Sequence, residues 1–262
     1  MKTKDVVAGL GEIGIPIMKL ISKGTIVVGM DTNSKLINKK KLAQYENLPT
    51  QVLHICIPYS GKFSKNILAL YKKFNPAIIV IHSTIAPYTT KKIQKILPIP
   101  VLYSATRGVH KKMLSDLKRY TKCFAIEPNA PRAKWAVSTY SKLCRKCGVK
   151  TKKISNPITL ELAKIIVDTS YYGWLINYAQ LSNMIAIQHK VNFDEMWSFA
   201  DEIHKYLGNR PKMYPGFIGG HCVIPNLKLM NDQTLDQIKQ VNNEYLKKVS
   251  NAKSIAKKYD KS

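Results

Sequence analysis

The sequence is poor in acidic residues and in arginine, and it contains no long apolar run. Its 262 residues include 42 Lys and Arg against 16 Asp and Glu, which gives a formal net charge of +26. A field of this sign attracts polyanions, nucleic acid among them. Only five of the basic residues are Arg, however, whereas sites that read bases favour the planar, bidentate guanidinium. Because the lysines are spread along the chain, we expect solvated helix faces that favour an anionic small molecule, with nucleic acid as the minority alternative.

The lack of a long apolar run means that no membrane span is predicted, and the first residues show no signal-peptide pattern. The five cysteines are an odd number without the spacing of a disulfide framework, so we expect reduced thiols in a cytoplasmic protein. Cys144 and Cys147 form a lone C-x-x-C. Zinc would need a second pair or histidines nearby, so no metal site is predicted.

The first 31 residues predict a strand, a tight turn, a helix and a second strand. Val6-Val7-Ala8 leads into a G-x-G-x-x-G run and then an apolar helix, whose N-terminal N–H groups and positive dipole end would face a pyrophosphate. Asp31 ends the second strand, about 20 residues beyond the glycines, where a carboxylate binds the ribose hydroxyls and repels a 2′-phosphate. The pattern therefore predicts NAD rather than NADP. The predicted cofactor-binding residues of the turn are Gly9, Leu10, Gly11, Glu12, Ile13 and Gly14.

Strands and helices then alternate up to residue 154. Short, almost wholly apolar runs are typical of parallel strands covered on both faces, and they occur at 51–58 and 77–81. Further short strands are predicted at 100–103, 123–126 and 149–154. We therefore predict an α/β fold. A Rossmann-type, doubly wound parallel sheet forms residues 1–154, and an all-helical domain forms residues 155–262. The end of the third strand adds Pro58 to the predicted cofactor site, and the family resemblance given below adds Ser83 and Thr84.

A long helix is predicted to organise the second domain. Asn156-Pro157 is a helix-start signal, and up to about Lys190 the chain has no proline and only one glycine, Gly173. Apolar residues cover so much of its girth that several neighbours must pack against it, which predicts a homodimer. One of its apolar stripes consists of Leu160, Ala163, Val167, Tyr171, Trp174, Tyr178, Leu181 and Ile185. Glu161, Lys164 and Asp168 interrupt the apolar pattern on one face; a plain salt-bridged edge is the alternative to a functional role.

Near the C-terminus a cysteine follows two glycines in a turn flanked by prolines, Tyr214-Pro215-Gly216-Phe217-Ile218-Gly219-Gly220-His221-Cys222 up to Pro225. The glycines let backbone approach a ligand closely, and the prolines fix the turn. This arrangement predicts a reactive thiol at Cys222. The alternative is an ordinary surface turn with an incidental cysteine.

Together the glycine loop and the Gly219-Gly220-His221-Cys222 segment resemble the nucleotide-sugar dehydrogenases of the UDP-glucose/GDP-mannose dehydrogenase family. The resemblance implies that Cys222 is the nucleophile and that the protein dimerises around its long helix. Glu161 to Asp168 is similar to the family's AExxK...N helix, which assigns catalytic roles to Lys164 and Asp168. Ser83 to Thr90 is similar to its STVPPGTT segment, which places Thr84 in the site; its alternative role is an N-cap for the helix beginning near Tyr88. Further catalytic and substrate-binding residues implied are Asn226, Tyr214, Phe217, Gly219, Gly220 and His221.

The sequence departs from the family pattern at three site positions. Asp168 replaces an asparagine, Asn226 replaces an aspartate, and Thr106 stands where the family has a glutamate. The resemblance extends from Val6 to about Lys248 and stops where the family's second nucleotide-binding domain begins, as expected of a short, divergent member. Its implied activity is NAD-dependent oxidation of an alcohol or aldehyde of an anionic, sugar-like substrate through a thiohemiacetal and thioester on Cys222. The alternative is an inactive relative that binds NAD or a nucleotide sugar as a sensor or partner subunit.

Overall fold

The computed structural model describes residues 2–108, 110–207, 215–219, 223–229 and 233–249. The chain divides into two compact units, residues 1–164 and 165–262. The predicted domain boundary at residue 154 lies ten residues before this division and stays a prediction. Among the described residues, no helix has the length and apolar character that crossing a membrane requires.

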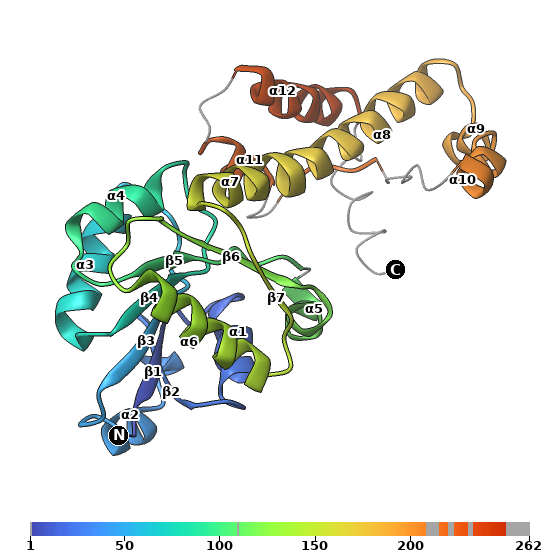
Figure 1. The fold of residues 1–262 in the computed structure, drawn as a ribbon. Coiled ribbons are helices and arrows are strands. Elements are labelled where there is room, and N and C mark those ends of the chain that lie inside the picture. Colours follow the sequence, from blue (N-terminus) through green and yellow to red (C-terminus); the bar gives the residue numbers. More distant parts are fainter. Residues whose placement is uncertain (1, 109, 208–214, 220–222, 230–232, 250–262) are drawn as a thin grey trace. The chain divides into compact units, whose positions relative to one another are not determined.

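The first unit is built on a seven-stranded sheet with the spatial order β2-β1-β3-β4-β5-β6-β7 (Figure 1). All neighbouring strands are parallel except β5 and β6. The strands are β1 (Lys4–Ala8), β2 (Ile26–Met30), β3 (Thr50–Ile55), β4 (Ile78–Ile81), β5 (Val101–Tyr103), β6 (Lys122–Ile126) and β7 (Thr151–Lys153). This is the predicted doubly wound α/β sheet, except that β5 and β6 break its predicted parallel arrangement. Apolar residues predicted β1, β3, β4, β5 and β6 correctly because these strands are buried, whereas β7 is polar and mostly exposed.

Helices cover the two faces of the sheet with two separate apolar clusters. On one face α1 (Gly14–Ile21), α5 (Met113–Arg119) and α6 (Ala133–Lys146) pack against alternate strand residues such as Val7 and Val80. On the other face α3 (Phe63–Phe74), α4 (Thr89–Ile96) and α7 (Pro157–Leu162) pack against their neighbours, including Val6 and Ile79. The short α2 (Lys39–Gln44) lies beyond β2 (Figure 1). Successive apolar residues of a strand such as Val6 and Val7 therefore contribute to opposite clusters.

The predicted long helix is helical from Pro157 to Gln188, but it is not a uniform α-helix. Asn156 caps it as predicted, because its Oδ1 accepts the N–H of Thr159 at 3.0 Å. After α7 the chain forms a π-helical segment, Ala163–Ser170, and then α8 (Tyr171–Gln188). Apolar periodicity gives no warning of this change, since a π-helix also buries one side and exposes the other.

In the second unit α12 (Gln233–Lys248) packs along α8. Gly173 allows a close approach, because a Cβ built on it would lie 3.0 Å from Val223 Cγ1 and 3.2 Å from Ile238 Cγ2. After α8 come two short helices, α9 (Phe193–Ser198) and α10 (Asp201–Leu207), separated by two residues although no glycine or proline marks the break. The short α11 (Val223–Leu227) follows the cysteine segment.

Candidate functional site

The three glycines of the β1–α1 turn have different surroundings. Gly9 has a φ of +91°, and a Cβ on it would lie 2.7 Å from the Cys56 backbone. A Cβ on Gly14 would lie 1.7 Å from the Gly9 carbonyl oxygen, which shows how closely the helix start packs on the turn. Around Gly11, in contrast, a Cβ would meet nothing within 4 Å. The first and third glycines are thus needed by the fold, and the second leaves open space for a ligand at the helix N-terminus.

Asp31 lies at the end of β2, as predicted, and holds the glycine turn in place. Its Oδ2 accepts the N–H of Leu10 at 2.6 Å, and its Oδ1 accepts the N–H of Asn33 at 2.8 Å. Burial by itself would raise the pKa of this carboxyl, but the hydrogen bonds from Leu10, Asn33 and Thr32 outweigh it and lower the pKa below its ordinary value. Because each carboxylate oxygen has two lone pairs, the partly exposed Asp31 keeps acceptor capacity for a ligand hydroxyl.

The loops after β3 and β4 meet at the same edge of the sheet. Ser83 Oγ donates a hydrogen bond to the carbonyl oxygen of Ile57 at 2.6 Å, which joins the two loops. Pro58 is exposed, and Ser83 and Thr84 are half-buried. Since carboxyl ends of parallel strands share one edge, the sheet brings these predicted residues to the edge that carries the glycine turn.

Thr84 does not cap the following helix. The N-cap of α4 is Tyr88, which has a left-handed backbone with φ of +65° and makes no side-chain capping bond. Glu161 takes that role from α7: its Oε2 accepts the N–H of Tyr88 at 2.6 Å, and its Oε1 accepts the N–H and hydroxyl of Thr90 at 2.9 and 2.6 Å. Thr84 as the N-cap of α4 was therefore a wrong prediction. The alternative of a plain salt-bridged edge is wrong for Glu161, which is buried and bonded to Tyr88 and Thr90. Sequence spacing within one helix could not reveal a contact with a helix 71 residues away.

Lys164 and Asp168 both lie in the π-helical segment. Lys164 is half-buried and Asp168 is exposed. The segment is closed by Ser170, whose hydroxyl donates to the carbonyl oxygen of Ile165 at 2.7 Å. Single turns of π-helix occur frequently at functional sites, although the geometry alone assigns no role to either side chain.

The cysteine segment is described in part. Tyr214, Gly220, His221 and Cys222 lie outside the described residues. Among the predicted substrate-binding residues that are described, Phe217 is half-buried and Gly219 is exposed, while Asn226 lies half-buried in α11. Residues 215–218 are held by side chains of α8 and α12, a contact that no local motif predicted.

No family model and no curated protein matches the sequence. Solved structures do match the fold. UDP-D-ManNAc dehydrogenase from Pyrococcus horikoshii superposes with a TM-score of 0.75 at 21% identity, over 93% of this chain and 69% of its own. UDP-N-acetyl-mannosamine dehydrogenase from Staphylococcus aureus gives 0.70 at 20% identity, over 93% and 68%. A 3-hydroxyisobutyrate dehydrogenase from Mycobacterium tuberculosis gives 0.67 at 13% identity, over 98% of both chains. The chain shares the fold of these dehydrogenases.

A row of buried polar side chains that the motifs missed runs across the sheet of the first unit. Asp5 Oδ2 lies 3.5 Å from His54 Nε2, and His54 Nδ1 lies 3.0 Å from His82 Nε2. His82 Nδ1 is 3.2 Å from the carbonyl oxygen of Ser104, which also accepts a hydrogen bond from Lys122 Nζ at 3.0 Å. Burial, together with Lys122 and His54, lowers the pKa of His82 well below its ordinary value. The signal in the sequence that could have indicated this row was the presence of polar residues inside otherwise apolar strands.

Lys122 connects this row to the position where the resembling family has a glutamate. Its Nζ donates to the Ala105 carbonyl oxygen at 3.2 Å and to Thr106 Oγ1 at 3.1 Å. Burial lowers the pKa of Lys122 to about 8, with smaller lowering effects from Lys164 and Arg107 and opposite effects from nearby cysteines. Thr106 is therefore tied to a buried cation.

Three of the described cysteines are weakly acidic thiols. Burial raises the pKa of Cys56 to about 12 and that of Cys144 to about 11, and it also raises the pKa of Cys147. Thiolates are the reactive form, so these three are unreactive at neutral pH. Among the residues that the structure describes, no group of three or more His, Cys, Asp and Glu could hold a metal ion.

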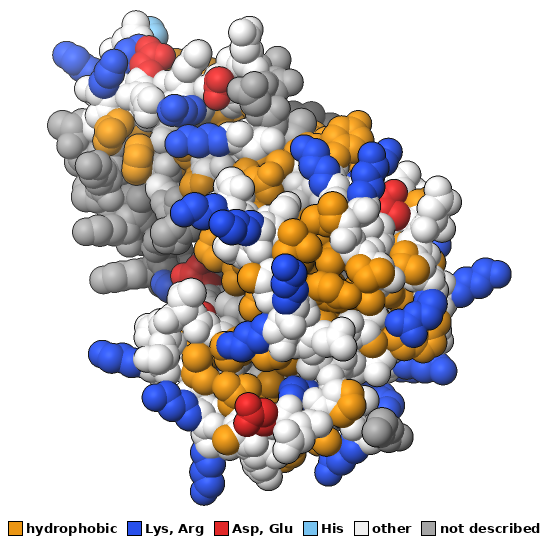
Figure 2. Space-filling model, turned by 90° about the vertical axis from the view of Figure 1, so that its left-hand side faces the viewer, with side chains coloured by type: hydrophobic (Ala, Val, Ile, Leu, Met, Phe, Trp, Pro, Cys, Tyr) orange, Lys and Arg blue, Asp and Glu red, His pale blue; other side chains and the backbone are white. Residues whose placement is uncertain are grey.

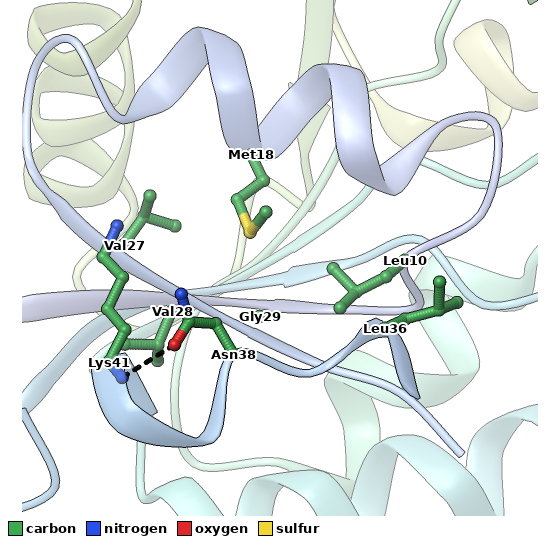
Figure 3. Close-up of a pocket in the computed structure, with 8 residues that line it drawn as sticks. All are labelled: Leu10, Met18, Val27, Val28, Gly29, Leu36, Asn38 and Lys41. Atoms are coloured by element: carbon green, nitrogen blue, oxygen red, sulfur yellow. Dashed lines mark hydrogen bonds between the residues drawn. The ribbon is translucent and has the colours of Figure 1, made fainter. Parts of the chain in front are cut away.

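A cavity of about 140 Å³ lies along the outer edge of β2. Figure 3 shows Met18 of α1 pointing toward β2, with Leu10 and Leu36 at one side and Asn38 and Lys41 at the other. The dashed bond in it is the N–H of Lys41 donating to Asn38 Oδ1 at 3.0 Å. Ligand pockets for molecules smaller than a dinucleotide already measure roughly 300 Å³ or more, so this apolar cavity is too small to hold NAD.

Basic residues are concentrated in the first unit. Residues 1–164 contain 30 Lys and Arg against seven Asp and Glu, whereas residues 165–262 contain 12 against nine. Figure 2 shows that on one face the Lys and Arg side chains are scattered among hydrophobic and uncharged groups. An excess of positive charge raises the local concentration of anions around the first unit.

Proposed function

We propose that this protein is an NAD-dependent oxidoreductase that oxidises an alcohol or aldehyde of an anionic, sugar-like substrate. The observation that carries the proposal is the open space at Gly11, at the N-terminus of α1, between two glycines that the fold itself requires. The fold and the carboxylate of Asp31 at the end of β2 support it. When bound, NAD would supply the hydride acceptor. Gly9, Gly11 and Gly14 would hold its pyrophosphate, and Asp31 would accept from its ribose hydroxyls.

The chain's own residues would carry the remaining chemistry. The Cys222 thiolate adds to the carbonyl carbon of an aldehyde and gives a thiohemiacetal; loss of a hydride leaves a thioester, which water hydrolyses to the acid and the free thiol. Lys164 is assigned to the oxyanion that forms when the thiolate adds. Thr84, Asp168 and Asn226 are assigned to placing water and substrate. These roles rest on the resemblance of the motifs to nucleotide-sugar dehydrogenases.

The substrate class follows from the same comparison. The proteins of similar fold from P. horikoshii and S. aureus are dehydrogenases of UDP-ManNAc, and the first unit carries a large excess of positive charge. A UDP-sugar carries a diphosphate, so both observations favour an anionic sugar nucleotide. An inactive relative that binds NAD or the sugar nucleotide is the alternative; it would bind and not turn over.

A second candidate function is the two-electron oxidation of a 3-hydroxy acid. It is favoured by one observation: the M. tuberculosis 3-hydroxyisobutyrate dehydrogenase matches this chain over 98% of both lengths. Such a reaction needs a hydride acceptor and a proton acceptor but no thioester. It would therefore leave Cys222 without a role in turnover.

Substrate oxidation tests both candidates. Purified protein is incubated with NAD and with UDP-ManNAc, UDP-glucose or 3-hydroxyisobutyrate, and NADH absorbance is followed for the wild type, Cys222→Ala and the matched control Cys123→Ala. We expect NADH from a UDP-sugar, lost in Cys222→Ala and kept in Cys123→Ala. NADH from the hydroxy acid in all three proteins would establish the second candidate. NADH binding without turnover of any substrate would establish the inactive relative.

Thiol labelling tests the nucleophile without a substrate. Iodoacetamide labelling of each cysteine is measured against pH by mass spectrometry. A working nucleophile should label fastest, with a midpoint below the free-thiol value of about 8.5. The raised pKa values of Cys56, Cys144 and Cys147 keep their labelling slow at neutral pH. Labelling of Cys222 no faster than theirs would remove it as nucleophile.

A further inference from the structure

Three side chains of the second unit bind the backbone just before the cysteine. Gln180 Nε2 donates to the carbonyl oxygen of Gly216 at 2.7 Å. Asn242 makes a pair of bonds with Ile218, accepting its N–H on Oδ1 at 2.7 Å and donating from Nδ2 to its carbonyl oxygen at 3.2 Å. The Tyr245 hydroxyl donates to the carbonyl oxygen of Pro215 at 3.4 Å. We call Gln180, Asn242 and Tyr245 the clasp.

The clasp is buried, and two of its members, Gln180 and Asn242, are bonded to each other. Gln180 and Tyr245 are 0% exposed and Asn242 is 2% exposed. Gln180 Nε2 also donates to Asn242 Oδ1 at 2.9 Å. Asn177 fixes the other end of the Gln180 amide by donating to its Oε1 at 2.7 Å, and Asn183 donates to the Tyr245 hydroxyl at 3.0 Å. The Gln180 amide uses both of its N–H groups and its carbonyl oxygen, and Asn242 uses its carbonyl oxygen and one N–H. Neither side chain can therefore rotate without losing buried hydrogen bonds.

Burying side-chain amides between two helices costs free energy unless the amides form hydrogen bonds, which apolar side chains cannot form. Here their partner is irregular backbone, since residues 215–218 belong to no helix or strand and their polar groups need partners. An apolar contact would hold the same segment without fixing its direction. The paired bonds of Asn242 with Ile218 fix both the N–H and the carbonyl of one residue.

The far side of the cysteine is anchored to the same place by apolar packing. Ile218 and Val223 belong to one apolar cluster with Leu227 and Ile238. In sequence Cys222 directly precedes Val223 and follows Ile218 by four residues. Both described flanks of residues 220–222 are therefore fixed to α8, α11 and α12.

We propose that Gln180, Asn242 and Tyr245 are positioning residues for the Cys222 thiol. The proposal rests on the proposed function, in which that thiol attacks a carbonyl carbon. Attack requires a fixed approach to the substrate, and a shift of about 1 Å in a reacting group can cost roughly a hundredfold in rate. The clasp supplies this fixity from α8 and α12, 24 to 36 residues away in sequence from the segment it holds.

The test combines amide hydrogen exchange at Ile218 with the pH profile of Cys222 labelling in the full chain. Gln180→Met keeps the side-chain length and removes the donors, and Asn242→Ala removes both bonds to Ile218. Asn242→Asp keeps the acceptor for the Ile218 N–H. Ser182→Ala is the matched control: it removes hydrogen bonds of the same helix, including the one from Trp197 Nε1 at 3.1 Å, without touching residues 215–218. Circular dichroism checks that each variant is folded.

In Gln180→Met and Asn242→Ala we expect the amide hydrogen of Ile218 to exchange about tenfold faster. We also expect the pH midpoint of Cys222 labelling to rise toward the free-thiol value of about 8.5. Asn242→Asp should lie nearer to the wild type, and Ser182→Ala should change neither quantity. A low wild-type midpoint that survives both substitutions would overturn the positioning role and leave the nucleophile standing. A wild-type midpoint near that of a free thiol would overturn both.

Discussion

The carboxylate of Glu161 accepts the backbone N–H of Tyr88 at 2.6 Å, and Tyr88 at this point has a left-handed backbone, with φ of +65°. Glu161 is wholly buried, and burial raises its pKa although three hydrogen bonds from Tyr88 and Thr90 oppose the shift. A buried acid of α7 thus holds the start of α4 and, with it, the loop that carries Thr84. The loop after β4 is therefore held by a bond between residues 73 positions apart in sequence.

The backbone of Tyr88 predicts an unusual stability result. A left-handed conformation costs a residue with a Cβ roughly 1–2 kcal/mol, and the Tyr88 side chain is 54% exposed, so its burial contributes little. Tyr88→Gly should therefore be more stable than Tyr88→Ala by about 1 kcal/mol, although glycine is the more flexible residue when unfolded. Urea unfolding of the two variants measures the difference. Equal stabilities, or a more stable alanine variant, would show that the backbone is not strained here.

The three glycines of the turn should separate binding from folding. Gly11→Val adds a side chain in open space, so we expect an unfolding free energy within about 0.5 kcal/mol of the wild type and loss of NAD binding. Gly14→Ala places a Cβ against the Gly9 carbonyl and should destabilise the protein by several kcal/mol. Calorimetry with NADH and NADPH, together with thermal melts, measures both effects.

Gly61→Val is the control for the glycine turn, because a Cβ there also meets nothing within 4 Å. It should bind NADH as the wild type does. Unimpaired NADH binding by Gly11→Val would exclude the turn as the pyrophosphate site, and NADPH binding as tight as NADH binding would exclude the ribose role of Asp31.

Local patterns predicted the elements of the first unit well and its long-range contacts poorly. The turn after β1 and the position of Asp31 follow from neighbours in sequence, because a tight turn must have its glycines in a fixed order. Glu161 contacts a helix start 73 residues away, and Gln180 contacts a loop 36 residues away. Nothing near either residue in sequence indicates its partner.

The contacts between buried polar residues were also not predicted from the sequence. Asp5, His54 and Lys122 lie in strands whose neighbours are apolar, and the apolar pattern alone predicted those strands correctly. Their polar partners become visible only when the strands are placed side by side in the order β1, β3, β4, β5 and β6. Likewise the π-helical segment around Lys164 depends on packing that periodicity does not contain.

The apolar stripe of α8 predicts association. Tyr171, Trp174, Tyr178, Leu181 and Ile185 recur every three or four residues and are 38–63% exposed. This is the spacing of a helix–helix seam, and an apolar surface of this extent favours contact with a partner. We propose that the partner is a second copy of the chain. Leu181→Lys should weaken a homodimer at least tenfold, because it places a charge in the seam.

Ile187→Lys is the matched control for the stripe. Ile187 is 52% exposed, and it faces away from the stripe because two residues beyond Ile185 turn an α-helix by about 200°. Sedimentation equilibrium at micromolar concentration should show dimers for the wild type and for Ile187→Lys, and more monomer for Leu181→Lys. A wild-type monomer, or equal effects of the two lysines, would contradict the proposed seam.

The buried ammonium of Lys122 predicts a pH dependence of stability. Its pKa is about 8 in the folded protein, against an ordinary value of 10.5, because burial disfavours the charged form. Below pH 8 both states carry the proton, so the folded protein bears the full cost of a buried charge. Between about pH 8 and 10.5 the folded state has released the proton and the unfolded state has kept it. Stability should therefore rise with pH across this window, by up to about 3 kcal/mol.

The comparison that isolates this contribution is between the wild type and Lys122→Met. Buried thiols such as Cys56, whose pKa is raised to about 12, act in the opposite direction, but they are common to both proteins. The unpaired Thr106 hydroxyl in the variant costs the same at every pH.

Unfolding by urea at pH 7 to 10 can be followed by Trp135, the one tryptophan in residues 1–164, after Trp174 and Trp197 are changed to Phe. The wild type should gain stability relative to Lys122→Met as pH rises, and relative to the exposed control Lys134→Met as well. If the free energies of unfolding of the wild type and Lys122→Met differ by the same amount from pH 7 to 10, folding does not disfavour the protonated form of Lys122.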